Sequence, residues 1–423
     1  MKKKKYYALV DCNNFYVSCE RVFNPKLKDK PVLILSNNDG CVVARSDEVK
    51  KLGIPMGVPF FQVKQLCLQH KVIVFSSNFA LYGDMSWRVM QILKEMSERL
   101  EIYSIDEAFL EFNDVADPEQ LLEMAHAIKA TIAQWIGLPV SIGLAATKTL
   151  AKVANRIAKH SSTGIFALFG EEVRLCALKN LPLSQIWGIG ARWEKQLNQK
   201  GLYTAWDLAQ LDPYYIKKQF GVVLGRIIYE LNGVPVLSSN LVAARKSILS
   251  SRSFGQPVTE FRDLLEAASC YAQQACTKLR RQGSVARAVQ IFLKIKPSDP
   301  KSRHYYDKQS LIYSLPEPTA DSRTIIKIIR HCLEKVYQPD TIYKKVGVLL
   351  LDLSSAQHGQ ASWLALEPPK AKQVMHVMDE INQRMGANTL FIASQGTCQR
   401  WKGRKNHCSP SYTSRWDALL EVG

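Results

Sequence analysis

The sequence lacks the features of a membrane or exported protein. No apolar stretch is long enough to span a bilayer. The basic N-terminus is followed by a short apolar run, residues 6–10, which Asp11 interrupts, so no signal-peptide core is expected. There is also no internal repeat and no low-complexity tract. These absences predict a cytoplasmic protein.

Paired cysteines are missing as well. The chain has 10 cysteines, but none form a C-x-x-C pair and no Cys/His ladder has zinc-site spacing. His407 beside Cys408 does not by itself indicate a metal site. Scattered cysteines are typical of a reducing compartment, where they behave as small hydrophobic residues.

Acidic residues are scarce relative to basic ones. The 56 Lys and Arg residues outnumber 38 Asp and Glu, giving a net charge of +18. Such a field attracts polyanions, most often nucleic acids. Solubility or a membrane-surface patch would explain the same charge, but no basic amphipathic helix with Trp or Phe on its apolar face is evident. The charge therefore favours nucleic-acid binding.

The length and pattern predict several domains. A chain of 423 residues, 47% of them hydrophobic, suits three or four domains with sizeable cores. Strands and helices alternate over residues 1–170, which predicts one α/β or α+β domain. Residues 173–233 are rich in predicted helix, residues 238–247 are typical of a linker, and residues 250–354 are mixed again.

Hydrophobic periodicity predicts the individual elements. In the first half, strands are expected at 6–10, 31–35, 41–44, 102–105, 108–112 and 140–144, and helices at 45–52, 79–100, 118–136 and 147–159. In the second half, helices are expected at 261–282, 321–335 and 370–385, and strands at 288–295 and 346–353. Asp39-Gly40 predicts a hairpin in which Gly40 takes the positive φ.

Three carboxylates lie at predicted strand ends. Asp11 follows one strand directly, and Asp106 and Glu107 lie at the junction of two others. Converging carboxylates repel one another unless cations neutralise them. Oxygen ligands suit Mg²⁺, and two such ions form a clamp for in-line phosphoryl displacement. The alternative is a solvated turn, because Asp-Glu pairs are common.

The sequence around the three carboxylates favours a metal site over a solvated turn. Asp11–Glu20 resembles the first active-site motif of the Y-family DNA polymerases, and Tyr103–Leu110 resembles the second. Further segments are similar to the UmuC branch of that family: Ser36–Arg45, Phe75–Asn78, Trp187–Gly190, Ser251–Gly255 and Ser409–Thr413. Because these segments occur in one order along essentially the whole chain, the resemblance is specific.

The resemblance implies an α+β multidomain fold of the right-hand type. The implied domains are a palm (1–23 and 77–172), fingers (24–76), a thumb with a helix–hairpin–helix (173–234), a linker (235–244), a little finger (245–354) and a C-terminal clamp- and partner-binding region (355–423).

The resemblance also implies an activity, error-prone DNA-directed DNA synthesis past lesions in the SOS DNA-damage response, by two-metal nucleotidyl transfer. We recognise no proofreading exonuclease motif, so errors would be retained. Two alternatives stay open: another two-metal phosphoryl-transfer enzyme on a palm, such as a nuclease or cyclase, and a non-catalytic DNA-binding subunit.

Site residues follow from the matching motifs. Asp11, Asp106 and Glu107 would be catalytic and would hold two Mg²⁺ ions together with the backbone carbonyl of Cys12. The implied nucleotide site comprises Phe15, Tyr16 as steric gate, Val43, Lys50 and Lys159. The chain departs from many relatives at two positions, with Lys50 in place of Arg and Asp47 in place of Tyr.

DNA contacts are implied along the second half of the chain and on one palm helix. The expected residues are Lys152, Gly188, Gly190, Arg252, Arg280, Arg281, Lys294 and Lys296. Solvated charge would explain most of them equally well. Lys294 and Lys296 alternate with apolar residues, which predicts a sheet with one basic face.

Implied partners are primer–template DNA, deoxynucleoside triphosphates, a processed UmuD-like accessory dimer, a recombinase filament and the sliding clamp, with no membrane. The clamp peptide would comprise Gln360, Ser362, Trp363 and Leu364. A protein with these partners is expected in the cytoplasm, associated with the nucleoid.

Overall fold

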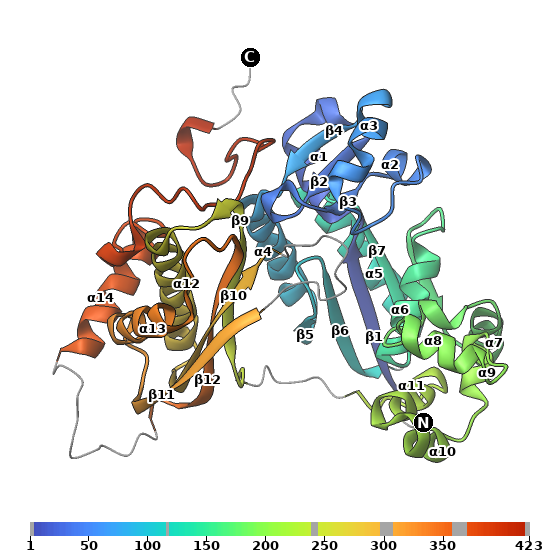
Figure 1. The fold of residues 1–423 in the computed structure, drawn as a ribbon. Helices are drawn as coiled ribbons and strands as arrows, with labels where there is room; N and C mark the ends of the chain where they lie inside the picture. Colours follow the sequence, from blue (N-terminus) through green and yellow to red (C-terminus); the bar gives the residue numbers. More distant parts are fainter. Residues whose placement is uncertain (1–3, 116–117, 238–243, 297–307, 358–369, 419–423) are drawn as a thin grey trace. The chain divides into compact units, whose positions relative to one another are not determined.

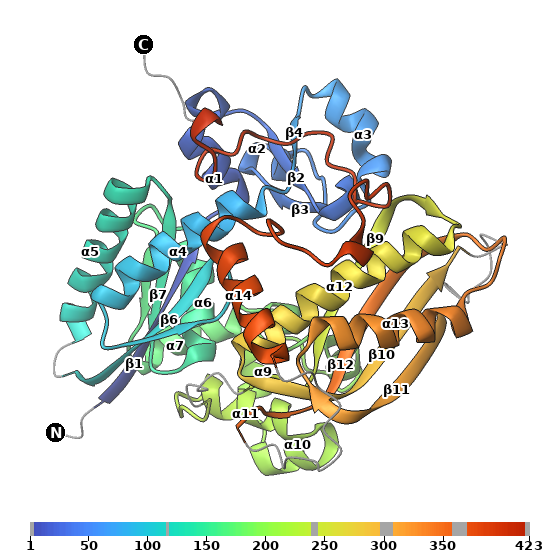
Figure 2. The same cartoon turned by 90° about the vertical axis from the view of Figure 1, so that its left-hand side faces the viewer.

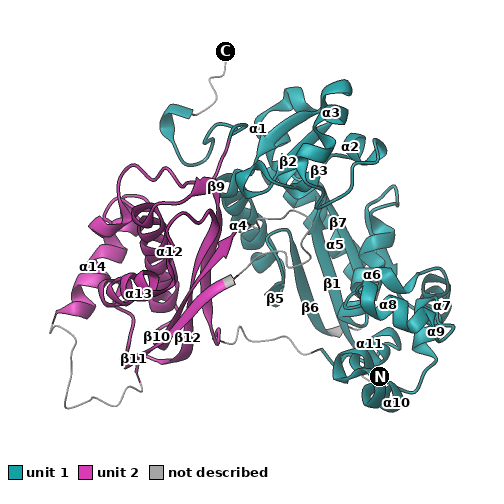
Figure 3. Cartoon of the chain, viewed as in Figure 1, with its two compact units in different colours: residues 1–241, 406–423 teal, residues 242–405 magenta. Residues whose placement is uncertain are grey.

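The computed structural model describes residues 4–115, 118–237, 244–296, 308–357 and 370–418. The chain forms two compact units, unit 1 (residues 1–241 and 406–423) and unit 2 (residues 242–405) (Figure 3). None of the helices in the described ranges is long and apolar enough to cross a bilayer.

Unit 1 is built on a five-stranded sheet of order β5-β6-β1-β7-β8 (Figure 1). Its strands are β1 (Lys4–Cys12), β5 (Arg99–Ile102), β6 (Glu107–Val115), β7 (Val140–Ala145) and β8 (Ile165–Leu168). Strand β1 is central and antiparallel to both neighbours. Because side chains alternate along it, Ala8 and Val10 pack with one set of helices and Tyr7 and Leu9 with another.

Helices cover both faces of this sheet. Helices α4 (Phe79–Glu95) and α5 (Pro118–Ile136) share a core with Ala8 and Val10 (Figure 2). Helix α6 (Lys148–Ala158) packs on the opposite face with Leu9. Asp11 continues the Tyr7 and Leu9 alternation, so it lies on the α6 side.

A second sheet of unit 1 has three strands. Strand β2 (Val32–Leu35) pairs antiparallel with β3 (Val42–Arg45) and parallel with β4 (Ile73–Ser76). Around it lie α1 (Phe15–Phe23), α2 (Asp47–Lys51) and α3 (Phe60–Gln69).

The expected hairpin between β2 and β3 is present, but the glycine assignment was wrong. Positive φ falls on Asn38 (63°) and Asp39 (49°), whereas Gly40 is right-handed at −80°. Asn and Asp tolerate the left-handed region because their side chains bond locally.

Five helices complete unit 1: α7 (Glu171–Lys179), α8 (Ala191–Asn198), α9 (Ala205–Ala209), α10 (Pro213–Phe220) and α11 (Val222–Leu231). They share a hydrophobic core with α6.

Two expectations near residue 100 were wrong. The helix predicted over 79–100 ends at Glu95, and Arg99–Ile102 forms β5 instead of the strand expected at 102–105. Pairing with β6 decides this segment, since Arg99 to Ile102 face Glu111 to Ala108. Helices α1 and α3 and strands β4, β8, β9 and β11 were not predicted.

Unit 2 contains a four-stranded antiparallel sheet of order β11-β10-β12-β9. Its strands are β9 (Ile248–Val258), β10 (Ser284–Ile295), β11 (Lys308–Thr319) and β12 (Tyr343–Ser355). Helices α12 (Phe261–Arg281) and α13 (Ser322–Val336) share its core, and α14 (Ala371–Arg384) follows.

The chain returns to unit 1 at Asn406. Tyr412 joins the core of unit 1, where its ring stacks on Phe23 with centroids 5.0 Å apart. Unit 2 is thus inserted into the sequence of unit 1.

Candidate active site

The register between β1 and β6 brings the three predicted carboxylates to one end of the sheet. Asp11 lies directly opposite Glu107. The N–H of Cys12 donates to the backbone oxygen of Asp106 over 2.9 Å. Since directly paired residues have side chains on the same face, Asp11 and Glu107 both point to the α6 side.

Helix α6 supplies two lysines to these carboxylates. Lys159 Nζ is 2.8 Å from Asp11 Oδ1, and Lys152 Nζ is 3.0 Å from both carboxylate oxygens of Glu107. Asp106 accepts a hydrogen bond from the Ser104 hydroxyl. Each carboxylate therefore faces a donor from the protein itself.

A glycine allows α6 to lie this close to the sheet. A Cβ on Gly143 of β7 would be 2.1 Å from the backbone N of Asn155 and 2.4 Å from the backbone O of Ala151. The Asn155 side chain fixes the helix by donating to the backbone oxygens of Leu9 (3.2 Å) and Ser141 (2.7 Å). The lysine positions thus depend on backbone contact between helix and strand.

Burial dominates the protonation chemistry at the strand end. It raises the pKa of Asp11, which Lys159 opposes and the negative charges of Glu107 and Asp106 reinforce. Burial likewise raises the pKa of the Cys12 thiol far above its usual value, which keeps the sulfur protonated. The thiol is therefore a poor metal ligand.

The donor chemistry of the cluster fits a hard cation. Three carboxylates and a backbone carbonyl offer only oxygen, which is the preference of Mg²⁺. Among the described residues, no group of three or more His, Cys, Asp and Glu side chains has the spacing of a metal site as the side chains stand. The two ammonium groups hold Asp11 and Glu107, so cation binding would require them to move aside.

Lys152 is enclosed by aromatic rings as well as by Glu107. Its Nζ is 4.4 Å from the ring centre of Tyr103 and 5.2 Å from that of Trp187. Trp187 Nε1 donates to the Tyr103 hydroxyl over 3.1 Å. Lys152 was predicted to contact DNA, with a solvated lysine face as the alternative. Its side chain instead is 18% exposed and lies at the carboxylates.

Tyr16 of α1 lies in an aromatic group next to the carboxylates. Its ring stacks on Tyr82 with centroids 4.4 Å apart at 12° and meets Phe79 edge-on at 6.2 Å. Burial and then the charge of Asp106 raise the Tyr16 pKa. Phe15, predicted beside it in the nucleotide site, is buried in the core, which favours a packing role.

The predicted nucleotide residues of the three-stranded sheet are accessible. Val43 of β3 is half-buried. Lys50 of α2 forms an ion pair of 2.8 Å with Asp47, and this lysine is the first cause of a lowered Asp47 pKa. Asp47, which departs from the family pattern, thus neutralises part of the positive charge with which Lys50 was predicted to bind a triphosphate.

The glycine motif of the helical region is only partly as predicted. Gly188 has φ +94°, and a Cβ there would be 2.9 Å from Ile227 Cδ1. Gly190 immediately precedes α8. The element before the motif is a short 3-10 turn, Leu183–Gln185, in place of the expected first helix.

Unit 2 has a basic sheet face. Lys294 lies directly opposite Lys345, on the side away from the buried Ile291 and Val346. Burial and then Lys294 lower the pKa of Lys345. Both lysines and Lys344 line a cavity of about 390 Å³. Lys344 and Lys345 were not identified from the sequence, because the strand predicted there, 346–353, begins after them, whereas β12 begins at Tyr343.

The other predicted DNA residues of unit 2 do not join this face. Arg280 donates to Asp379 of α14 at 2.6 and 2.8 Å and to the backbone oxygen of Ala320, which favours a structural role over the predicted DNA contact. Arg252 pairs with Val346 and so lies on the opposite side of the sheet. Arg281 is exposed at the end of α12.

Lys296 follows the end of β10 and is exposed, with its N–H donating to the backbone oxygen of Ile342. The clamp peptide predicted at Gln360, Ser362, Trp363 and Leu364 falls outside the described residues.

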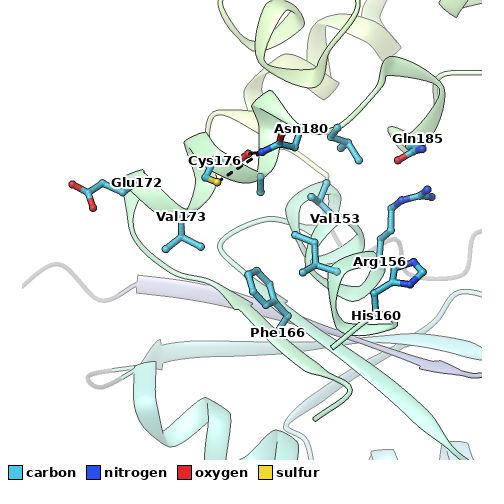
Figure 4. A pocket seen from close by; sticks show the side chains of 12 residues that line it. Val153, Arg156, His160, Phe166, Glu172, Val173, Cys176, Asn180 and Gln185 are labelled. Carbon is cyan, nitrogen blue, oxygen red and sulfur yellow. Dashed lines mark hydrogen bonds between the residues drawn. The ribbon is translucent and has the colours of Figure 1, made fainter. Parts of the chain in front are cut away.

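A separate cavity of about 610 Å³ lies between α6, β8 and α7 (Figure 4). Its wall is mainly apolar, with Val153 and Phe166 beside Arg156 and His160, and Asn180 donates to the backbone oxygen of Cys176 within it. None of the three carboxylates lines this cavity.

Carboxylates at a sheet end, a lysine-bearing helix against them and a further four-stranded sheet define a right-hand polymerase fold of the Y family. The structure is similar to a Y-family DNA polymerase chimera of Dbh and Dpo4, with a TM-score of 0.64 and 21% identity over 83% of this chain and 99% of that chain. An insertion ternary complex of Dbh DNA polymerase has a TM-score of 0.54, with 21% identity and the same coverage.

Sequence comparison gives the particular family. Residues 10–156 match the impB/mucB/samB family, residues 245–363 match the C-terminal domain of that family, and residues 372–422 match a domain of unknown function. The chain belongs to the impB/mucB/samB family.

Named relatives cover nearly the full chain. Protein UmuC of Salmonella typhimurium is 40% identical over 98% of this chain and 100% of its own. Protein ImpB of Salmonella typhimurium is 39% identical over 97% and 98%. DNA polymerase IV of Dehalococcoides mccartyi is 29% identical over 90% and 95%. The resemblance to Y-family polymerases is thus confirmed, and the enzyme class is DNA-directed DNA polymerase.

Proposed function

We propose that this polymerase carries out error-prone translesion synthesis in the SOS response. The observation that carries the proposal is the convergence of Asp11, Asp106 and Glu107 at one sheet end, beside two lysines of α6. The similarity to UmuC, and to a solved ternary complex of a related fold, supports primer–template DNA and deoxynucleoside triphosphates as substrates.

Two Mg²⁺ ions would be held by the three carboxylates and the Cys12 carbonyl. Bound there, they would activate the primer hydroxyl and neutralise the leaving pyrophosphate. Lys159, now 2.8 Å from Asp11, would turn to the incoming triphosphate. Lys152 would balance the charge of Glu107, with which it makes its closest contacts.

The proposed division of labour follows the family fold. The five-stranded sheet with α4 to α6 is assigned to the palm (1–23 and 77–172), the three-stranded sheet to the fingers (24–76) and the helical region to the thumb (173–234). The four-stranded sheet is assigned to the little finger (245–354).

Tyr16 is proposed as the steric gate. Its ring is held between Phe79 and Tyr82 and senses the charge of Asp106, so it can lie beneath a nucleotide sugar at the metal site. A rigid ring in that place excludes a ribose 2′-hydroxyl. Val43 is proposed to cover the nascent base pair and Lys50 to contact the triphosphate.

DNA is proposed to run along the basic face of unit 2. Lys294, with the neighbouring Lys344 and Lys345, would contact backbone phosphates without reading sequence. The backbone at Gly188 and Gly190 would do the same. From the family we also propose a processed UmuD-like dimer, a recombinase filament and the sliding clamp as partners, in the cytoplasm at the nucleoid.

Primer extension on a template with one abasic site tests the proposal. Wild type is expected to extend past the lesion in Mg²⁺, with accessory proteins if needed. Asp106→Ala should lose at least about 1,000-fold in rate, since the clamp loses a ligand. Asp84→Ala, which breaks only a surface pair with Arg88 on α4, is the matched control.

The outcome separates the alternatives. Cleavage or cyclisation without a template would favour another two-metal phosphoryl-transfer enzyme. DNA binding with no extension would favour a non-catalytic DNA-binding subunit. Equal extension by wild type and Asp106→Ala would mean that Asp106 takes no part in the chemistry.

A further inference from the structure

The C-terminal segment 406–412 lies against the elements that carry the nucleotide site. The N–H of Asn406 donates to Asp39 over 2.8 Å, and the N–H of His407 donates to Ser76 Oγ over 3.1 Å. In return, the N–H of Ser76 donates to the His407 backbone oxygen over 2.8 Å. These three hydrogen bonds, one of them between backbone groups, hold the segment at the end of β4, just before α4 begins.

Ser409 is the buried centre of the segment. It is 8% exposed, and its Oγ is 3.0 Å from Glu20 Oε1 and accepts from Asn78 Nδ2 over 3.0 Å. Asn78 also caps α4, since its Oδ1 accepts from the N–H of Leu81. One serine hydroxyl thus joins helix α1, which carries Glu20, to the first turn of α4.

Glu20 accepts a second hydrogen bond, from the hydroxyl of Tyr82. Tyr82 donates to the same Oε1 over 2.8 Å, and both residues are almost completely buried. In the described part of the chain Glu20 Oε2 has no hydrogen-bond partner. Burial raises the Glu20 pKa, and the hydroxyls of Tyr82 and then Ser409 oppose the shift. Two hydroxyls therefore stabilise this carboxylate where solvent cannot.

The connection ends at Tyr16. The ring of Tyr82 stacks on it at 4.4 Å, nearly parallel, so the orientation of Tyr82 sets the position of the Tyr16 ring. A side chain held by packing and hydrogen-bonded support keeps its geometry better than an isolated one.

We infer that Ser409 of the C-terminal segment is a positioning residue for the nucleotide site, which acts through Glu20 and Tyr82 on Tyr16 and thereby sharpens sugar discrimination. The inference rests on the proposed role of Tyr16 as steric gate. It assigns a role in substrate selection to part of residues 372–422, which match a domain of unknown function.

The test compares the kcat/KM of deoxy- and ribonucleotide insertion. Ser409→Ala should lower the discrimination ratio about tenfold, because small misplacements of a positioning group cost up to two orders of magnitude. Deoxynucleotide insertion itself should change little. Ser414→Ala, two residues beyond Tyr412 and exposed, should leave the ratio unchanged.

A double-mutant cycle tests the route. Tyr82→Phe keeps the ring and removes the hydroxyl that reaches Glu20. If Ser409 acts through this pair, the double variant loses no more discrimination than the more affected single variant. Fully additive losses, or a ratio unchanged in Ser409→Ala, would overturn the inference.

Tyr16→Ala distinguishes a failure of the inference about Ser409 from a failure of the steric-gate proposal. Loss of discrimination in Tyr16→Ala but not in Ser409→Ala would overturn only the inference about Ser409. Unchanged discrimination in Tyr16→Ala would overturn the steric-gate proposal and this inference with it. Hydrogen exchange of residues 78–85 gives a readout without catalysis: faster exchange in Ser409→Ala is expected, and unchanged exchange contradicts the coupling.

Discussion

The two main sheets of the molecule differ in how their charged side chains are paired. In unit 1 the acidic residues Asp11 and Glu107 each face a lysine from the helix laid on the sheet. In unit 2 Lys294 lies across from Lys345, and like charges repel. The first site is balanced internally, so that an entering cation exchanges with an ammonium group. At the second site a bound anion, such as a DNA phosphate, would reduce the repulsion between the two lysines.

Each sheet also has a glycine that makes room for its neighbour. At Gly143 an added Cβ meets backbone atoms of α6, whereas at Gly347 of β12 it meets the side chains of Phe292 and Ser251. Backbone cannot turn aside, but a ring can rotate. The sheet of unit 1 is thus expected to tolerate less change than that of unit 2.

The largest expected effect follows from this contrast. Gly143→Ala should destabilise unit 1 by about 3 kcal/mol or more, and Gly347→Ala should destabilise unit 2 by about 1–2 kcal/mol. Urea unfolding followed by hydrogen exchange of each unit measures both. Gly83→Ala on α4, with nothing within 4 Å of the new Cβ, is the control and should be neutral or stabilising. Equal effects at Gly143 and Gly83 would contradict the close approach of α6.

The balance of charge in unit 1 can be broken at Lys152. Lys152→Met leaves the largely buried Glu107 without its ammonium partner and should cost about 2 kcal/mol in EDTA. Mg²⁺ should restore part of this loss, because a bound cation replaces the missing charge. Thermal unfolding with and without Mg²⁺ measures the difference.

Lys148→Met is the matched control for that experiment. Lys148 is on the same helix and pairs with Glu101 over 2.6 Å, outside the three carboxylates. Its loss of stability should not depend on Mg²⁺. The same Mg²⁺ dependence in both variants would mean that the ion does not act at Glu107.

The excess charge of unit 2 can be reduced at Lys294 and Lys345. The double variant to Ala should bind primer–template DNA about tenfold more weakly and lower the slope of log K against log salt by about 2. Fluorescence anisotropy over a range of salt measures both quantities. Lys327→Ala, exposed on α13, should leave the slope nearly unchanged, and an equal fall there would refute the assignment of a binding face.

The smallest effect is expected at Lys50. Because its pair with Asp47 is exposed, Lys50→Ala should change stability by less than about 0.5 kcal/mol. The KM for deoxynucleotides should rise about threefold, roughly 0.6 kcal/mol, if Lys50 contacts the triphosphate. Steady-state insertion kinetics measure this, with the neighbouring exposed Lys51→Ala as control. An unchanged KM in Lys50→Ala would mean that Lys50 does not contact the triphosphate.

The sequence allowed much of the carboxylate cluster to be predicted. Asp11, Asp106 and Glu107 could be placed together because each follows or precedes a short apolar run, and strand ends converge at a sheet edge. Lys152 and Lys159 could both be placed on or at the end of the helix predicted at 147–159. The contacts of a helical side chain depend on the tertiary structure. For that reason Lys152 was assigned to DNA, although it lies against Glu107.

Other features depend on contacts that the local sequence does not specify. Ser409 lies 331 residues from its partner Asn78, and nothing in the segment around it specifies that contact. Residues 99–102 continue a helical pattern, yet pairing with β6 makes them a strand. In both cases the deciding interaction is distant in sequence.

The return of the chain to unit 1 has a consequence for biosynthesis. A ribosome releases the two sheets of unit 1 early, and domains generally fold in the order in which they emerge. Ser409 and Tyr412 emerge only after all of unit 2. Until then the hydrogen bond of Ser409 to Glu20 and the stacking of Tyr412 on Phe23 cannot form. Nascent chains and prematurely terminated products would therefore carry the carboxylates without the contacts of Ser409 with Glu20 and Asn78.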